Sequence, residues 1–139
     1  MKWLGFFFVA IFSLNAVSEI VTVPTGLSPG DEYRLVFITS TKTNALSSDI
    51  SYYNDFVMAR ANSVPGLSEI GSTWRVIGST SSISAKSNTN TDDSPAGPNG
   101  PPIFRLDGMS IANNYDDLLD GAILNPLYVT EIGTVLDTC

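Results

Sequence analysis

Histidine is absent from all 139 residues of the sequence. This absence excludes Ser-His-Asp and Cys-His arrangements for nucleophilic catalysis, and it also excludes histidine-ligated zinc and histidine acid–base catalysis. The glycines at 66, 71 and 78 are too widely spaced for a phosphate-binding loop and lack its lysine. With these classes removed, carboxylate chemistry is the one kind of site chemistry left open, and we expect a protein that is not an enzyme.

Cysteine is nearly absent as well, since the single cysteine, Cys139, is the last residue. No internal disulfide can form, so the fold must rely on its apolar core or on a metal ion. Two interpretations of Cys139 stay open: it pairs with a cysteine of another molecule, or it marks an arbitrary end of the reading frame.

Basic residues are few. Seven lysines and arginines stand against fourteen acidic residues, which gives a net charge of −7. A chain with this balance is repelled by nucleic acid and by anionic membranes and attracts cations instead. We therefore expect no nucleic-acid partner.

The N-terminus has the three parts of a secretory signal peptide. Lys2 supplies positive charge, an apolar run covers residues 4–14, and Ala16-Val17-Ser18 places small residues before a cleavage site between Ser18 and Glu19. The run of about 11 residues is shorter than the ~20 that a membrane-spanning helix needs. An uncleaved anchor and a buried strand are the alternatives. Cleavage predicts a secreted or extracellular protein, or one of the cell envelope.

The expected mature chain, residues 19–139, forms one domain. Its roughly 120 residues suffice for one apolar core and are too few for two. It keeps six basic and fourteen acidic residues, a net charge of −8. No second apolar segment approaches membrane length, so no membrane span is expected after cleavage.

Hydrophobic patterning predicts an α+β domain. Tyr33–Thr39 is β-branched and aromatic and predicts a strand, and Thr73–Ser79 predicts a second one. A helix is expected from about Asp49 to Asn62, capped by Ser47 or Ser48, because apolar residues recur at spacings of three and four. This apolar stripe is expected to face a sheet that contains Leu35, Phe37 and Trp74; its members are Ile50, Tyr53, Val57 and Ala61.

The second half begins with a long polar stretch, residues 81–101, which is poor in apolar side chains. We expect a surface loop there, because little apolar burial offsets the entropy of ordering it. A short strand over Ile103–Leu106, a turn at Asp107-Gly108 and a short helix over Tyr115–Leu119 follow. Residues 124–136 are mixed, with a strand possible at their end.

Four aspartates are the candidate ligands for a metal ion: Asp92, Asp93, Asp116 and Asp117. Carboxylate oxygens of this kind suit calcium, although the stretch from Asp92 lacks the alternating ligands and distal glutamate of an EF-hand. A different interpretation is that they carry solvated loop charge and cap a short helix. Two aspartates acting as the acid and base of a hydrolase form a third possibility, which requires a defined separation across a cleft.

The order of several segments resembles a domain of exported bacterial proteins that often end in a PEP-CTERM-type sorting signal. The matching segments are YRLVFITS, SSDISYYNDFV, TWRVIGST, IFRLDGMSIANNYDDLLDG and NPLYVTEIGT, within residues 33–134. Their layout is also similar to endostatin, the C-terminal domain of collagens XV and XVIII. The resemblance implies a C-type lectin-like fold, with two helices, small antiparallel sheets and long loops.

Two departures from the family pattern qualify this resemblance. Relatives continue into a Trp-x-Gly-type segment and closing strands, whereas this chain stops at Cys139, so the expectation is a domain whose C-terminal part is missing. The Glu-Pro-Asn and Gln-Pro-Asp motifs of calcium-dependent sugar-binding lectins are also absent, and Asn125-Pro126-Leu127 is only superficially similar.

The resemblance implies a non-enzymatic recognition or adhesion domain of the cell surface or extracellular matrix, with an extracellular protein or glycan as partner. No cofactor is expected. A calcium-dependent carbohydrate-binding module and a secreted hydrolase that uses paired aspartates are the alternatives.

Signal cleavage makes a direct prediction about the exported product. Mass spectrometry of secreted material should find an N-terminal peptide that begins at Glu19. Recovery of intact Met1 from the membrane fraction would show that the apolar run is an anchor.

Overall fold

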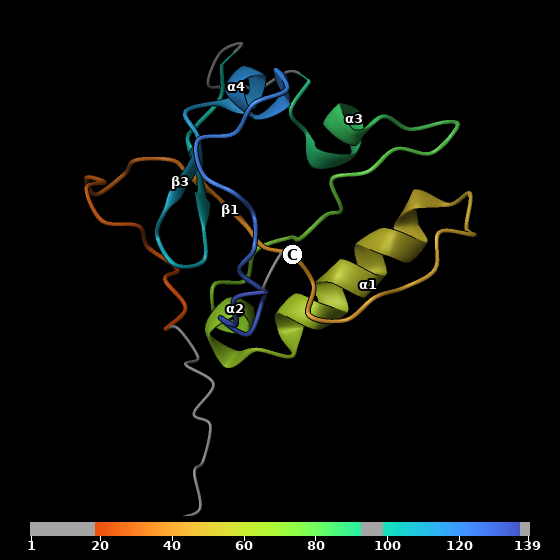
Figure 1. Cartoon of the computed structure of the whole chain (residues 1–139), viewed down its shortest axis with the longest axis horizontal. Coiled ribbons are helices and arrows are strands. Elements are labelled where there is room, and N and C mark those ends of the chain that lie inside the picture. Colours follow the sequence, from red (N-terminus) through yellow and green to blue (C-terminus); the bar gives the residue numbers. More distant parts are fainter. Residues whose placement is uncertain (1–18, 93–98, 137–139) are drawn as a thin grey trace, which may run out of the picture.

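The computed structural model describes residues 19–92 and 99–136 (Figure 1). This part of the chain is a small α+β domain with four helices and one sheet of three strands, which confirms the predicted class. In chain order the elements are β1 (Arg34–Val36), α1 (Ile50–Asn62), α2 (Pro65–Glu69), α3 (Ala85–Thr89), β2 (Ile103–Arg105), β3 (Ser110–Ala112) and α4 (Tyr115–Leu119).

The sheet has the order β1-β2-β3 and is mixed, whereas the resemblance implied antiparallel sheets. β1 pairs with β2 in parallel, with Arg34 opposite Ile103, and β2 pairs with β3 in antiparallel fashion. A parallel pair requires a long crossover, and the chain supplies one by passing through α1, α2 and α3 between the two strands. The turn from β2 to β3 uses Asp107-Gly108 as expected, with Gly108 at a φ of +84°.

Helix α1 has nearly the predicted extent, but its cap differs from the prediction. The Asp49 carboxylate, not Ser47 or Ser48, accepts the amide of Ser51 at 2.9 Å. The helix ends at Asn62, and α2 begins at Pro65, where a missing amide hydrogen costs nothing. Two helices were implied by the resemblance; the described residues contain four, of which α2, α3 and α4 have five residues each.

The predicted strand over Thr73–Ser79 is wrong, because no partner strand lies beside it in the described residues. Side chains take the hydrogen bonds that a ladder would have made. The amide of Val76 donates to Oδ1 of Asn54 at 3.0 Å, and Nδ2 of Asn88 donates to the carbonyl of Val76 at 2.8 Å. The backbone of Val76 is thereby satisfied without a sheet.

The predicted surface loop over residues 81–101 is also partly wrong. Helix α3 lies within it, capped by the Ser84 side chain on the amide of Ser87 and ending at Asn90, which has a left-handed φ of 54°. Asn88 and Thr91 are buried. Hydrogen bonding, not apolar contact, holds them there, because Asn88 is bonded to both Asn54 and Val76. Residues 93–98 lie outside the described residues.

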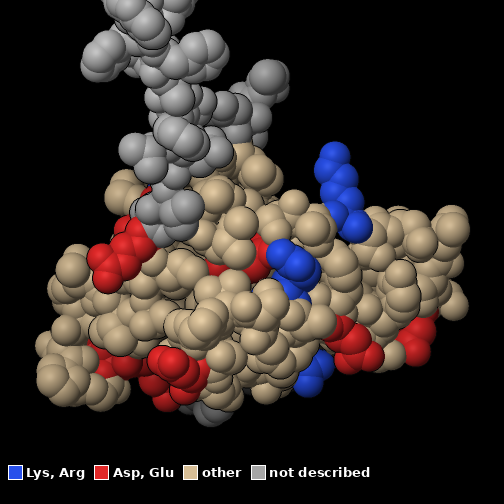
Figure 2. All heavy atoms as spheres, turned by 90° about the horizontal axis from the view of Figure 1, so that it is seen from below, with Lys and Arg blue, Asp and Glu red and all other residues tan. Residues whose placement is uncertain are grey.

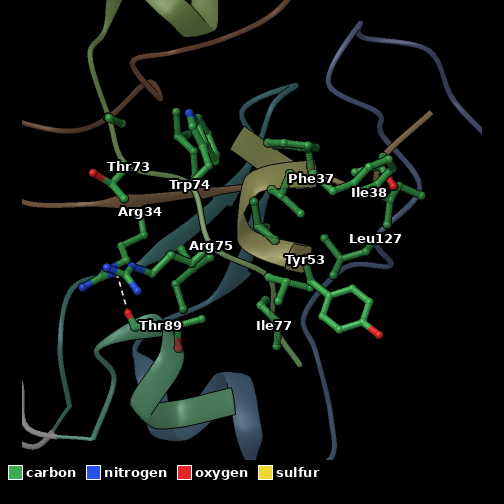
Figure 3. A pocket seen from close by; sticks show the side chains of 18 of the residues that line it. Arg34, Phe37, Ile38, Tyr53, Thr73, Trp74, Arg75, Ile77, Thr89 and Leu127 are labelled. Carbon is green, nitrogen blue, oxygen red and sulfur yellow. Dashed lines mark hydrogen bonds between the residues drawn. The ribbon is translucent and has the colours of Figure 1, made fainter. Parts of the chain in front are cut away.

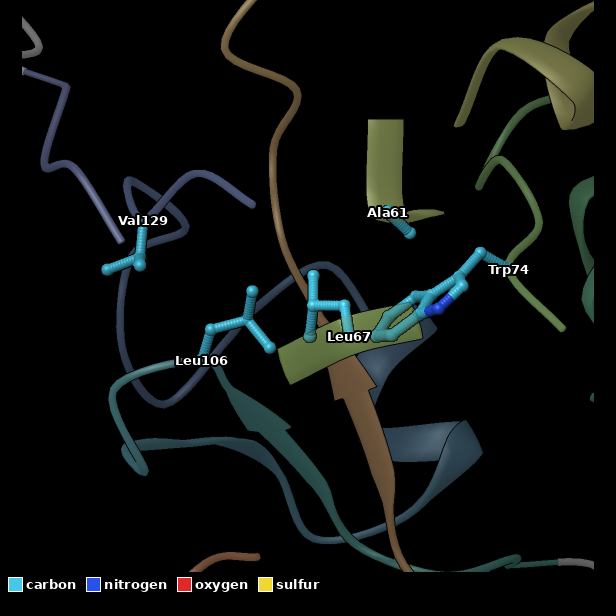
Figure 4. Close-up of a cluster of buried hydrophobic side chains, with 5 residues drawn as sticks. All are labelled: Ala61, Leu67, Trp74, Leu106 and Val129. Carbon is cyan, nitrogen blue, oxygen red and sulfur yellow. The ribbon is translucent and has the colours of Figure 1, made fainter. Parts of the chain in front are cut away.

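The main core cluster joins α1, α2 and the sheet. Its buried members, drawn in Figure 4, are Ala61, Leu67, Trp74, Leu106 and Val129. Leu35, Phe37 and Val57 pack against them while staying partly exposed. Val57 and Ala61 of the predicted stripe thus make the expected contacts, whereas Ile50 and Tyr53 are not part of this cluster. A second cluster contains Ile103, Ile111, Ala112 and Tyr115 and joins the sheet to α4. In Figure 1, α4 lies at one end of the sheet and α2 at the other.

A buried arginine connects the sheet to the C-terminal segment. Arg105 in β2 is 1% exposed. Its guanidinium donates to both carboxylate oxygens of Asp107, at 2.8 and 2.6 Å, and to the carbonyl of Pro126 at 2.5 Å. The ring of Tyr128 lies 3.9 Å from the guanidinium carbon. The Arg105 hydrogen bond holds the pKa of Asp107 below its usual value, against the opposing effect of burial.

A second ion pair connects the same segment to α1. Glu131 is fully buried and accepts bonds from Arg60 at 2.5 and 2.7 Å. The amide and hydroxyl of Ser40 also donate to it, at 2.7 and 2.6 Å. Burial by itself raises the pKa of Glu131, but the bonds from Ser40 and Arg60 outweigh it, and the pKa lies below its usual value.

No helix among the described residues is long and apolar enough to cross a membrane.

Burial predicts which leucine the fold depends on. Leu67 is 1% exposed and Leu46 is 87% exposed. Replacing each leucine by alanine therefore compares a core position with a surface position. Leu67→Ala should lower the free energy of unfolding by about 2–5 kcal/mol, and Leu46→Ala by less than about 0.5 kcal/mol. Urea denaturation of both variants measures the difference, and equal midpoints would contradict the assignment of the core.

The two ion pairs predict a loss of stability in acid. Asp107 and Glu131 have pKa values in the folded chain below the ordinary 3.8 and 4.5. Their stabilisation is complete above those ordinary values and disappears as the pH falls through the lower folded values. Glu131→Gln should therefore destabilise the chain most near pH 7, and the difference from wild type should shrink below about pH 4. Urea midpoints across that range test this, and a difference that grows in acid would contradict it.

Candidate functional site

A large pocket runs along β1 and is the candidate site. It has a volume of about 1320 Å³. One wall is formed by Tyr33–Thr39 and the opposite wall by residues 72–77, while α1, the end of α3, β2, α4 and the C-terminal segment also contribute lining residues. Figure 3 shows this arrangement from close by, with Phe37 and Ile38 on one wall and Thr73 to Ile77 on the other. We call this feature the β1 groove.

The β1 groove exposes one edge of the sheet. β1 is an edge strand, because β2 is its only neighbour among the described strands. The amide of Arg34 donates to Pro102 on the β2 side, and the amide of Ile38 donates to Val129. Backbone groups of alternate residues in a strand point to opposite edges, so those of Leu35 and Phe37 face away from β2. The amide of Phe37 has no partner among the described residues.

Positive charge is concentrated at the β1 groove. Of the described residues that line it, Arg34, Lys42 and Arg75 are basic and none is acidic. All three are exposed. Within the described residues, the other basic side chains are Arg60 and Arg105, which are held in ion pairs, and Lys86, which does not line the groove. A chain with an excess of acid thus places three of its seven basic residues along one pocket.

Neutral groups hold Arg34 in place at the α3 end of the groove. Its Nε donates to the hydroxyl of Tyr115 at 2.5 Å, and its Nη1 donates to the carbonyl of Thr89 at 3.0 Å. Its guanidinium carbon lies 5.0 Å from the centre of the Tyr115 ring. In Figure 3, Arg34 and Arg75 extend toward the same end of the pocket. These bonds orient the guanidinium without neutralising its charge.

An aromatic pair joins the two walls of the groove. Phe37 and Trp74 meet edge to face, with ring centres 4.9 Å apart and an angle of 61° between the rings. Trp74 is 8% exposed, and its Nε1 is the one buried side-chain polar atom without a hydrogen-bond partner in the described part of the chain. Trp74 is therefore part of the core, and it also lines the groove.

The aspartates proposed as metal ligands are not brought together where the structure describes them. Asp92 accepts a bond from the Ser87 hydroxyl beside α3, and Asp93 lies outside the described residues. Asp117 accepts from the amide of Asn113 at 2.6 Å at the start of α4, and Asp116 is exposed on that helix. Asp92 and Asp117 therefore accept hydrogen bonds beside the helix next to them, and Asp116 faces solvent.

No group of three or more potential ligands for a metal ion lies together in residues 19–92 and 99–136. Figure 2 shows one face of the molecule, on which the acidic side chains lie in several separate groups between uncharged residues.

One serine lies in a sequence that has the form of a nucleophile elbow. Ser28 lies at the centre of Gly26-Leu27-Ser28-Pro29-Gly30, which has the G-x-S-x-G spacing. The structure places it in an exposed turn, where its amide donates to the Asp31 carboxylate at 2.7 Å. No strand precedes the turn and no helix follows it, as an elbow requires.

Sequence patterns did not identify the β1 groove. Arg34 and Arg75 are 41 positions apart and look like isolated charges on two predicted strands. Arg105 lies in a third predicted strand and is buried in the structure, so the sequence pattern by itself does not distinguish the groove arginines from it.

Comparison with known proteins adds no assignment. No protein-family model matches this chain, and no curated protein and no solved structure is significantly similar to it.

Proposed function

We propose that this protein is an exported, non-enzymatic recognition domain, of the C-type lectin-like class, that binds an extracellular partner in the β1 groove. The observation that carries the proposal is the charge distribution: a pocket of about 1320 Å³ is lined by three basic and no acidic described residues in a chain of net charge −7. A local field of opposite sign to the rest of the molecule steers a ligand of complementary charge to that one place.

The size of the groove supports recognition of a polymer. Pockets for small molecules are usually about 300–1,000 Å³ and enclose most of the ligand. The β1 groove exceeds this range and extends along a strand from Tyr33 to Thr39 and on to Thr43. Such a shape suits a chain-like ligand that is held at several points.

The local bonding of the carboxylates supports a binding role over catalysis. A hydrolase that uses two carboxylates needs them to face each other across a cleft. Asp92 and Asp117 instead accept hydrogen bonds from their own neighbourhoods, and no described acidic residue lines the groove.

The order of elements supports the C-type lectin-like part of the proposal. In the resemblance, a first strand, a helix, a strand that ends in paired small residues, a short strand, an aspartate-containing turn and a short helix before a glycine follow one another. The strand that ends in paired small residues, expected over Thr73–Ser79, is the one member that is not formed here. β1, α1, β2, the turn at Asp107-Gly108 and α4 before Gly121 occur in this order here.

Binding to the surface of the producing cells tests the proposal. Fluorescently labelled exported chain should be retained by these cells. A Lys42→Glu, Arg75→Glu double variant should lose at least about tenfold in apparent affinity, which corresponds to about 1.4 kcal/mol. Lys86→Glu is the matched control, because it reverses an exposed charge outside the groove. Equal retention of all three chains would contradict a binding role for the groove.

A further inference from the structure

We propose that the ligand of the β1 groove is an extended peptide with alternating acidic and apolar residues, bound as an additional strand along the free edge of β1. This inference rests on the proposed function of the groove and specifies its ligand. Three features of the groove support it: an unpaired strand edge, basic residues without acidic neighbours, and an apolar floor.

The strand edge supplies the backbone contacts. Leu35 and Phe37 direct their backbone groups away from β2, toward the groove, and Phe37 has no partner for its amide among the described residues. An extended peptide completes such an edge with main-chain hydrogen bonds, which give affinity without regard to sequence. Across the groove, Val76 has its amide and carbonyl already bonded to Asn54 and Asn88, so it does not compete for the same groups.

The basic residues select the charge of the peptide. Lys42 and Arg75 are exposed and have no ion-pair partner among the described residues, and Arg34 is bonded only to neutral groups. They lie on both walls of the groove, since Arg34 and Lys42 belong to the β1 side and Arg75 to the opposite side. Carboxylates on a peptide between these walls meet positive charge on either side.

The apolar floor explains why a peptide fits better than a uniformly charged polymer. Phe56, Val57 and Trp74 line the groove and offer no charge for a ligand to pair with. Successive side chains of a strand point to opposite faces, so an alternating peptide places apolar groups on this floor and carboxylates away from it. A nucleic acid or a polyuronate carries charge along its whole length and is repelled by the acidic surface outside the groove.

Charge also argues against a second copy of this chain as the occupant. A second copy would bring its own three basic groove residues to a groove that already carries three. Like charges placed opposite one another across paired strands are destabilising. An acidic peptide replaces that repulsion with attraction.

Fluorescence anisotropy with a labelled octapeptide of four Glu-Val repeats tests the proposal on the exported chain. We expect saturable binding that weakens as NaCl is raised. The Lys42→Glu, Arg75→Glu double variant should bind at least tenfold more weakly, and Lys86→Glu should bind within twofold of wild type. A Lys-Val octapeptide should not bind.

The wild-type chain provides a second measurement that does not depend on the stability of any variant. The same Glu-Val sequence with every backbone amide N-methylated keeps its charges and side chains but cannot pair with a strand, and it should lose binding. The Glu-Val peptide should slow amide hydrogen exchange at Phe37. If the N-methylated peptide binds as well as its parent, or if exchange at Phe37 is unchanged, strand addition is overturned.

The remaining outcomes separate this inference from the proposed function. If the cells retain the chain through the groove but the Glu-Val peptide does not bind, the ligand class is wrong and the recognition role stands. If a labelled polyuronate binds as tightly as the Glu-Val peptide or more tightly, the assignment of a peptide ligand is also overturned. Dimerisation in sedimentation that the double variant abolishes would assign the groove to a second copy. If the cells do not retain the wild-type chain and the Glu-Val peptide does not bind to it, both proposals are contradicted.

Discussion

The buried guanidinium of Arg105 organises the second half of the chain. A fully buried arginine is costly unless every direction it faces offers an acceptor or a ring, and Arg105 meets Asp107, the carbonyl of Pro126 and the ring of Tyr128. These groups come from the turn after β2 and from the C-terminal segment. Asp107 compensates the buried charge, and the contacts with Pro126 and Tyr128 hold the C-terminal segment against the sheet.

The position of the C-terminal segment decides which edge of β1 is covered. Once Pro126 and Tyr128 are held by Arg105, Val129 accepts the amide of Ile38 and Glu131 reaches Arg60 and Ser40. Beyond Val36, where the ladder with β2 ends, the C-terminal segment therefore takes the place of β2 and pairs with the same edge of the chain at Ile38. The other edge, which faces residues 72–77, is left open, and the β1 groove is the consequence.

Polar side chains replace a strand ladder on the far wall of the groove. Asn54 and Asn88 bond to each other and to the backbone of Val76, and so hold α1, α3 and residues 72–77 together. A sheet in this place would have bonded the backbone along its whole length. Side-chain bonding satisfies one residue of the segment and leaves Arg75, which is exposed, beside the groove. The same arrangement thus shapes the site and supplies one of its charges.

The sequence by itself determined the elements whose causes are local. The apolar spacing of residues 50–61 predicted the extent of α1, and Asp107-Gly108 predicted the turn, because each depends on residues within one or two turns of chain. Only the tertiary structure decided the parallel pairing of β1 with β2 and the absence of a strand at residues 73–79. It also decided that Ala85–Thr89 forms α3 in place of a surface loop. In each of these, hydrogen bonds join groups more than ten positions apart, and composition does not reveal such partners. The concentration of Arg34, Lys42 and Arg75 along one pocket has the same cause, since proximity in the fold depends on which distant backbones pack together.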